Sequence, residues 1–250
     1  MKVRQMIGRN RSGAKLSPEL GREMVAATEE FPPSAPGDAR AIAETRIAYA
    51  REGEPAATMP PPAGAKDVAT KALKALRGAG NPNVLLDKLG ERLAYERSGV
   101  RLYEALLSKH DAFGGFTGGP TRAEIEQVRD QEHQHFTMLA DAVQRLGGDP
   151  TAVTPSANVQ ATATLGMCQA LSDPRIDLLS SLEVTQTVEL ADNDCWTALI
   201  ELLRNAGEAE TAHRFEEALA HEREHLRLVR RWVAAGQGRS PESAGGASTP

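Results

Sequence analysis

The sequence predicts an all-α protein, a four-helix bundle with one long crossover between its second and third helices. From about Asn83, four long segments repeat apolar residues at alternating spacings of three and four, the pattern of a buried helix face. The connections within the first and last pairs of segments are short, which makes neighbouring helices antiparallel, whereas the middle connection has about 27 residues and can cross the bundle. Strand patterns are weak throughout.

Residues 1–80 precede the bundle and are predicted to form an extension. They are rich in small and polar residues and contain the proline-rich stretches FPPSAPGDA at 31–39 and TMPPPAGA at 58–65. Two short helices are expected within them, at PELGREMVAATEEF and DARAIAETRIAYAREG. Because neither helix can bury much surface alone, the extension is predicted to be partly disordered.

Residues 81–235 are predicted to form the bundle domain. The first helix covers 83–109 and ends before the glycine-rich loop AFGGFTGGP. The second begins at the N-cap Thr121, where Glu124 completes a capping box, and ends at LGGDP, residues 146–150. The third helix is expected at 174–205 and the fourth at 207–235, after the turn RNAGEAE. The tail, 236–250, is rich in glycine, serine and proline and is predicted to be disordered.

Composition excludes several classes of function. The net charge is −5 and the pI is near 5.8, so no overall attraction to nucleic acid or to anionic lipid is expected. The two cysteines form no CxxC metal motif, and no apolar run approaches the ~20 residues that a membrane span needs. The basic N-terminus lacks the apolar stretch of a secretory signal, so a cytoplasmic protein is predicted.

The apolar seam of each predicted helix is interrupted near its middle by a glutamate. The interrupting residues are Glu96 in the first helix, Glu132 and His135 in the second, Glu189 in the third, and Glu222 and His225 in the fourth. Four carboxylates in a dry core repel one another and cost free energy unless cations pair with them. Positions i and i+3 lie on one helix face, so Glu132 and His135 can reach one ion, or Glu132 can bridge two. Oxygen and imidazole ligands suit iron or manganese better than calcium.

An internal repeat supports the same interpretation. Glu132 and Glu222 are 90 residues apart, as are the two seam histidines, and Glu96 and Glu189 are 93 apart. Tyr103 and Trp196 each follow the glutamate of their own helix by seven residues. The two helical hairpins therefore look like copies of one unit, which a pseudo-twofold site for two metals would require.

These residues resemble the di-iron carboxylate proteins of the ferritin-like superfamily. In that pattern two helices each contribute a glutamate and two others each contribute Glu-x-x-His, here EHQH at 132–135 and EREH at 222–225. A tyrosine seven residues after Glu96 is similar to the first helix of ferritins and rubrerythrins. The resemblance covers about residues 83–235 and implies two iron ions, with manganese as an alternative, bound by the six seam residues.

The resemblance implies reaction with O2 or H2O2, of the ferroxidase or peroxidase kind, with an external electron donor that the sequence does not identify. The chain lacks the two CxxC pairs of rubrerythrins and the fifth helix of cage ferritins, so a storage shell is not expected. Three alternatives stay open: a non-catalytic iron-binding or stress-response protein, a di-iron hydroxylase, and a dimanganese catalase-like enzyme. A homodimer is also left open.

Four further residues are candidates for supporting the metal ligands. Gln186 and Asn193 lie one turn on either side of Glu189 and could orient ligands through hydrogen bonds. Tyr103 and Trp196 could do the same, although aromatic residues on a seam are more often core filler.

The remaining polar residues near the pairs are assigned by their position on the helix. Asp130 and Asp192 are candidates to accept from the histidine ring N–H groups. His133 and His221 point off the seam and are expected at the surface.

Overall fold

The computed structural model describes residues 18–30, 39–53 and 82–238. The chain divides into two units, Met1–Glu54 and Pro55–Pro250. The first unit contains helices α2 (Pro18–Glu30) and α3 (Arg40–Glu52), within the two stretches where the sequence predicts short helices. The predicted disorder of the extension and of the tail concerns stretches that lie mostly outside the described residues.

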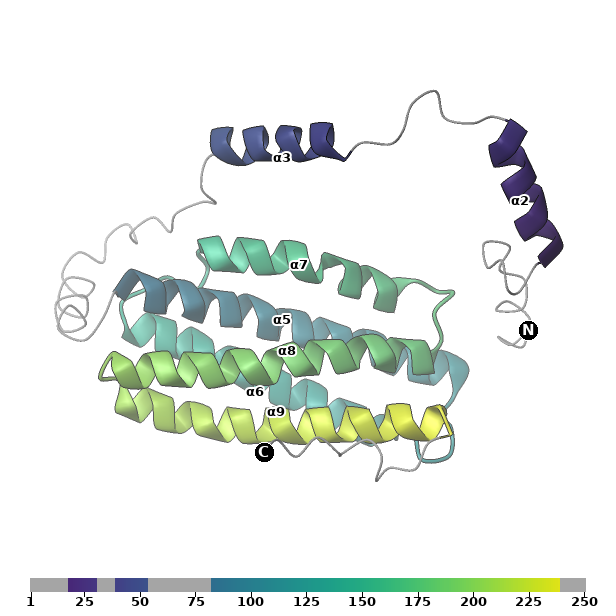
Figure 1. Ribbon diagram of the computed structural model, residues 1–250. Helices are drawn as coiled ribbons and strands as arrows, with labels where there is room; N and C mark the ends of the chain where they lie inside the picture. The colour runs from purple at the N-terminus through teal and green to yellow at the C-terminus, as the bar shows by residue number, and fades with distance from the viewer. Residues whose placement is uncertain (1–17, 31–38, 54–81, 239–250) are drawn as a thin grey trace, which may run out of the picture. The chain divides into compact units, whose positions relative to one another are not determined.

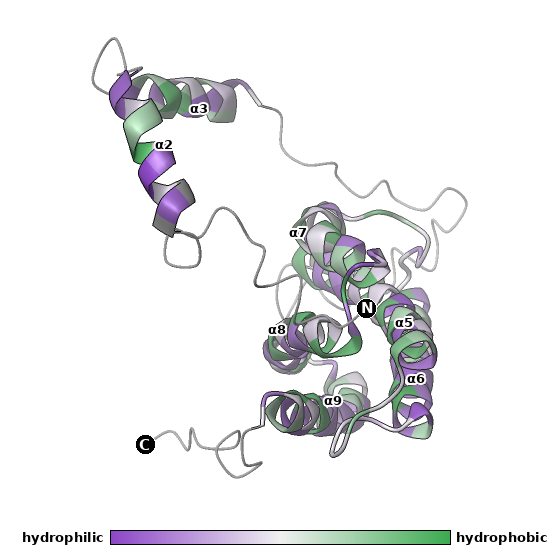
Figure 2. Cartoon of the chain, turned by 90° about the vertical axis from the view of Figure 1, so that its right-hand side faces the viewer, coloured by the Kyte–Doolittle hydropathy of each residue, from purple (hydrophilic) through white to green (hydrophobic). Residues whose placement is uncertain are grey.

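Between Pro82 and Gly238 the structure describes five helices of the second unit, and no strand occurs among the residues that it describes. They are α5 (Pro82–Phe113), α6 (Arg122–Arg145), α7 (Pro155–Ser172), α8 (Leu178–Asn205) and α9 (Ala209–Gly236). Helix α5 packs on α6 and α8, while α9 packs on α8 and α6, so four helices surround a common core (Figures 1 and 2). In the described part of the chain, no helix is both long and apolar enough to cross a membrane.

Local sequence explains where these helices begin and end. The predicted capping box of α6 is present. The backbone N–H of Glu124 donates to the Thr121 hydroxyl, and the backbone N–H of Thr121 donates to the Glu124 carboxylate. Helix α5 runs four residues beyond its predicted end and stops at Gly114, which adopts φ +73°. Helix α8 begins four residues later than predicted, because the Asp177 side chain accepts from Ser180 N–H and so caps the helix there.

The long connection between α6 and α8 contains a helix, α7, that the apolar spacing of the sequence does not predict. Thr154 caps it by accepting from Ala157 N–H, and proline occupies its first turn. Ser156 binds the Asp87 carboxylate near the start of α5, and Lys109 near the end of α5 donates to the carbonyl that follows α7. The predicted long crossover therefore exists, as a helix that lies along α5 (Figure 1).

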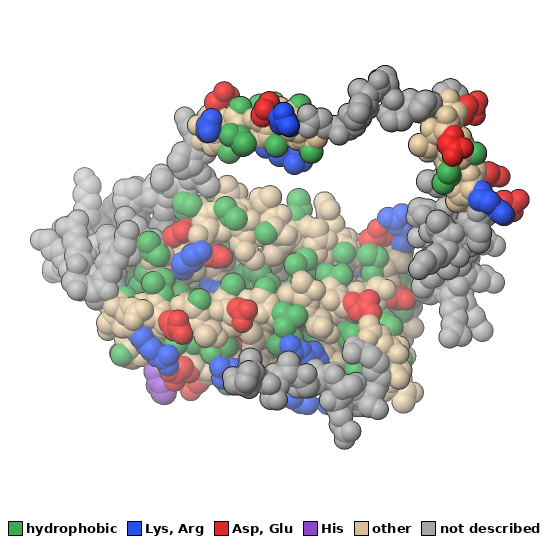
Figure 3. Space-filling model, viewed as in Figure 1, with side chains coloured by type: hydrophobic (Ala, Val, Ile, Leu, Met, Phe, Trp, Pro, Cys, Tyr) green, Lys and Arg blue, Asp and Glu red, His purple; other side chains and the backbone are tan. Residues whose placement is uncertain are grey.

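Apolar side chains also face outward on α7. The helix contains no charged residue, and its Val159 and Leu165 are 60% and 56% exposed. Figure 3 shows apolar side chains over this helix, between the charged groups of the neighbouring surface.

The apolar core of the bundle consists of two clusters separated along the helix axes. On α6 the first cluster includes Leu139 and the second includes Val128. On α9 the first includes Leu219 and the second Val229. The segments between them, around residues 132–135 and 222–225, carry the polar seam residues, so the bundle places these halfway along a closed apolar core.

Candidate metal centre

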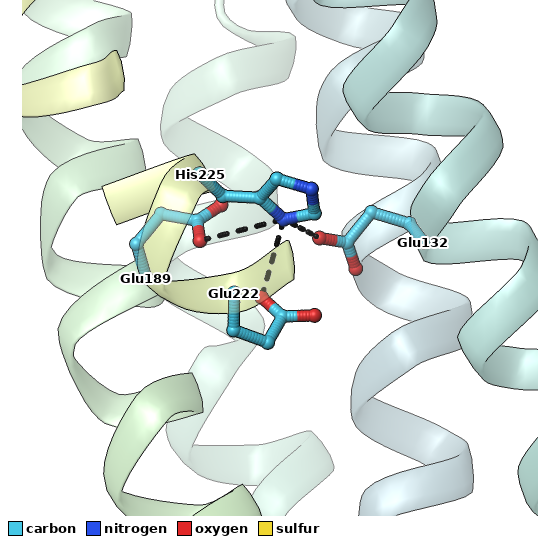
Figure 4. Close-up of side chains that lie close together, drawn as sticks. All are labelled: Glu132, Glu189, Glu222 and His225. Carbon is cyan, nitrogen blue, oxygen red and sulfur yellow. Dashed lines mark hydrogen bonds and ion pairs between the residues drawn. The ribbon is translucent and has the colours of Figure 1, made fainter. Parts of the chain in front are cut away.

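The structure brings the six predicted ligands together in one cluster. Each is buried, with no more than 3% of its surface exposed. The six residues are Glu96 on α5, Glu132 and His135 on α6, Glu189 on α8, and Glu222 and His225 on α9. Three glutamates and one histidine of the cluster are seen in Figure 4, converging from three helices. Burial of this many ionisable side chains costs free energy unless cations pair with the carboxylates or the carboxylates bind protons.

Each histidine directs its Nδ1 atom at carboxylate oxygens. His225 Nδ1 lies 3.2 Å from Glu222 Oε2, 3.3 Å from Glu132 Oε1 and 4.0 Å from Glu189 Oε2 (Figure 4). His135 Nδ1 lies 2.6 Å from the other oxygen of Glu222. It also lies 3.6 Å from Glu96. Glu222 therefore faces both histidines with different oxygens, which is the position of a carboxylate that could bridge two ions.

Three overlapping groups of ligand atoms, each within 4.8 Å, could hold a metal ion. They are Glu96, His135 and Glu222; Glu132, Glu189, Glu222 and His225; and Glu96, Glu132, Asp192 and Glu222. Glu222 belongs to all three groups, and the two histidines belong to different groups. Glu96 of α5 and His135 of α6 thus lie at one end of the cluster, Glu189 of α8 and His225 of α9 lie at the other, and Glu132 and Glu222 each belong to groups with members of both ends.

Glu96 and Glu189, the glutamates at the two ends of the cluster, each accept a hydrogen bond from an aromatic side chain through one carboxylate oxygen. Glu96 Oε1 accepts from Trp196 Nε1 at 3.0 Å, and Glu189 Oε1 accepts from the Tyr103 hydroxyl. Each aromatic donor thus serves the glutamate of the opposite repeat, rather than acting only as core filler. The second oxygens of both glutamates are buried and have no hydrogen-bond partner. One oxygen is therefore fixed while the other is free to bind a cation.

The outer nitrogens of the two histidines have partners that follow the same repeat. His225 Nε2 lies 2.9 Å from Gln131 Oε1, and His135 Nε2 lies 3.2 Å from His221 Nδ1. An amide oxygen can only accept, so Nε2 of neutral His225 carries the hydrogen and its Nδ1 lone pair faces the carboxylates. His221 lies off the seam, as predicted, but it is only partly exposed, and its ring stacks against His135. His133 is exposed, as predicted.

The environment of the cluster disfavours the charged form of most of its ionisable side chains. Burial, followed by the neighbouring carboxylates, raises the pKa of Glu132 and Glu222 well above the usual value, and burial followed by Asp192 does the same for Glu189. Burial also lowers the pKa of His225 to about 3, so its imidazole is neutral at physiological pH. Burial alone would raise the pKa of Glu96, but the adjacent Arg92 guanidinium lowers it.

The cluster contains a buried positive charge, Arg92, that the apolar spacing does not predict. Arg92 Nη2 donates to Glu96 Oε1 at 2.9 Å and forms an ion pair with Asp192. No other arginine among the described residues is buried, and a single arginine one turn before a seam glutamate carries no periodic signal. Its position four residues before Glu96 places it on the same helix face, which is the one feature of the sequence that indicates an ion pair with that glutamate.

Gln186 and Asn193, the two residues of α8 expected to support Glu189, each lie one position away from the buried face of the helix. Their neighbours Thr185 and Asp192 are buried, whereas Gln186 and Asn193 are partly buried, since spacings of three and four both return to the same helix face. Asn193 is partly buried and donates to the backbone oxygens of Glu189 and Glu222, which ties α8 to α9.

The two candidate partners for the histidine rings also need correction. Asp130 is exposed and pairs with Arg129, so it does not accept from a histidine ring. Asp192 pairs with Arg92 inside the acidic cluster.

The donor set fits a divalent metal ion. Unpartnered buried atoms include Glu96 Oε2, Glu189 Oε2, Glu222 Oε1 and His135 Nδ1, all of them carboxylate or imidazole atoms of the cluster. His135 Nδ1 and Glu222 Oε1 lie close together without hydrogen-bonding geometry, as two ligands of one ion would. These residues could hold a metal in the core of the bundle.

Comparisons with models of known families, with curated proteins and with solved structures found no match. The likeness to the ferritin-like superfamily therefore rests on the residues and their arrangement in this chain.

Proposed function

We propose that this protein binds two iron ions in its acidic cluster and reacts with O2 or H2O2, as a ferroxidase- or peroxidase-like protein of the ferritin-like kind. The observation that supports this is the set of unpartnered carboxylate and imidazole atoms facing one another in a closed core. Two divalent cations offset the charge of four glutamates, and imidazole together with carboxylate suits iron or manganese.

The protein's own residues prepare the site for this chemistry. Tyr103 and Trp196 each fix one oxygen of a terminal glutamate, so the free oxygen keeps its direction when charge at the site changes. Gln131 fixes the tautomer of His225, so that Nδ1 is ready to bind a metal without losing a proton. Glu222 presents one oxygen to each end of the cluster.

A bound pair of Fe(II) ions would supply two electrons, which together with two protons would reduce one H2O2 to two water molecules. The chain's role is to hold protons nearby and to exclude bulk water. Burial and the Glu189 carboxylate raise the pKa of Tyr103 well above its usual value, so its hydroxyl stays protonated on Glu189 Oε1. The apolar clusters on either side of the site along the helix axes exclude bulk water from it.

A hollow beside the cluster favours a second candidate, oxidation of an organic substrate. It has a volume of about 310 Å³ and is lined by Val84, Lys88, Glu91, Arg92, Cys195, Ala198, Leu199 and Leu202, between α5 and α8. Arg92 is common to this hollow and to the hydrogen bonds of Glu96. A small apolar molecule held there would lie one side chain away from the metals.

The test is turnover by iron-loaded protein. Metal-free protein is loaded with Fe(II) without oxygen, mixed with excess H2O2 and ascorbate, and peroxide consumption is followed. Many turnovers per site, lost in Glu222→Gln and kept in the exposed control Glu224→Gln, support an enzyme. One oxidation per site indicates a metal-binding protein without turnover. Failure of the wild type to take up Fe(II) would refute the proposal.

A further inference from the structure

Arg92 and Asp192 form a buried ion pair that the proposed reaction does not use. Each side chain is only 3% exposed. The Arg92 guanidinium also donates to Glu96 and lies 4.3 Å from the centroid of the Tyr95 ring, so its position is fixed on three sides. A guanidinium keeps its charge even when buried. The cluster therefore contains one permanent cation of its own.

The internal repeat shows that this pair exists in only one half of the bundle. By distance from the seam glutamates, Glu96 corresponds to Glu189, Arg92 to Thr185, and Gly99 to Asp192. Thr185 has no charge and donates to the carbonyl of Ser181, on its own helix. At Gly99 a Cβ would lie 2.2 Å from a Glu132 oxygen, so the space that Asp192 fills in one repeat is taken by Glu132 in the other.

The two ends of the cluster therefore differ in their electrostatics. We call the end formed by Glu96 and His135 the α5–α6 position, and the end formed by Glu189 and His225 the α8–α9 position. The glutamate of the α5–α6 position accepts from a guanidinium, whereas that of the α8–α9 position accepts from the neutral Tyr103 hydroxyl. A fixed positive charge within a few ångströms weakens binding of a divalent cation by about a factor of ten or more.

We propose that Arg92 and Asp192 make the two metal positions unequal, so that the α8–α9 position binds its ion tightly and the α5–α6 position binds weakly. This inference rests on the proposed dimetal function. In the one-metal state Arg92 neutralises Glu96 and takes the place of the second cation. Asp192 offsets part of the charge of Arg92, so that a second ion can still enter. The pair sets the order in which the two positions fill.

The test is titration of metal-free protein with Co(II), followed by calorimetry and visible absorption. The wild type is expected to bind in two resolved steps. Arg92→Gln should tighten the weaker step by about tenfold or more, because the repelling charge is gone. Asp192→Asn should weaken the same step by a similar factor, because Arg92 then acts on the ion without a counter-charge. Damage to the fold would weaken binding in both variants.

Exposed residues on the same two helices supply controls. Arg97→Gln and Asp194→Asn make the same changes of charge at the surface and should leave both steps within about threefold of wild type. Arg92→Lys, which keeps the charge, should also stay near wild type. Two equal steps in the wild type, or shifts in the same direction in both test variants, would overturn the inference. Absence of Co(II) binding in the wild type would instead refute the dimetal function.

Discussion

Gly99 shows how closely the α5 backbone approaches the acidic cluster. A Cβ at this position would lie 2.2 Å from Oε2 and 3.0 Å from Cδ of Glu132, and the carboxylate has no room to retreat in a packed core. Gly99→Ala should therefore displace Glu132, lower the free energy of unfolding by about 1–3 kcal/mol and reduce metal content.

The matched control for this prediction is Gly166→Ala on α7. A Cβ there meets nothing within 4 Å, so the change should raise the free energy of unfolding by about 0.5–1 kcal/mol, through helix propensity alone. Denaturant melts of both variants measure the difference. Equal effects of the two substitutions would show that Gly99 does not make room for Glu132.

At the scale of residues, periodicity located the seam glutamates and histidines because each breaks an otherwise apolar stripe. Arg92 could not be found this way, since an arginine at the edge of a stripe usually lies in solvent with its stem on the surface. Asp192 and Asn193 are adjacent, and both fit a helical spacing from Glu189. Only the packing of α8 against its neighbours decides which of them is buried.

At the scale of elements, the caps of α6 and α7 should differ in their contribution to stability. The Thr121 cap is exposed, whereas Thr154 is 1% exposed and also donates to the carbonyl of Asp87. Thr121→Ala should lower the free energy of unfolding by about 1 kcal/mol. Thr154→Ala should lower it by about 2 kcal/mol or more, because the carbonyl oxygen of Asp87 also loses its hydrogen-bond donor. Chemical denaturation of both variants checks the order, and a larger loss in Thr121→Ala would contradict it.

The four bundle helices could be predicted to within four residues, because each combines a long apolar stripe with a cap or a glycine. Helix α7 could not, since its sequence PSANVQATATLGMCQALS has neither charges nor a clear polar face. The Thr154-Pro155 start was a valid helix signal, but small and apolar residues after it gave no periodicity to follow.

At the scale of the whole molecule, the stability of the metal-free protein should fall as pH rises. The pKa values of Glu132, Glu189 and Glu222 are raised in the fold, and that of Asp192 is raised to about 7, chiefly by burial. Carboxyls with raised pKa values stabilise the fold when protonated, and this contribution is lost as pH rises through the folded values. His225, whose pKa is lowered, acts in the opposite direction below pH 6.5, but it is one group against four.

The corresponding measurement is the unfolding midpoint of metal-free protein between pH 5 and pH 8. A clear decrease is expected across this range. The increase in unfolding midpoint that metal binding produces should grow as pH rises, because the ligands must lose their protons before they bind a cation. A metal-free protein that is equally stable at both pH values would show that the carboxyls are not buried together.

The central claim is that the acidic cluster holds metal, and metal content per chain tests it most directly. Protein loaded with Fe(II) without oxygen and then desalted should contain about two ions per chain by elemental analysis. Glu132→Ala and Glu222→Ala should halve or abolish this content, while the exposed control Glu224→Ala should keep it. Unchanged loading in both Glu132→Ala and Glu222→Ala would contradict the account.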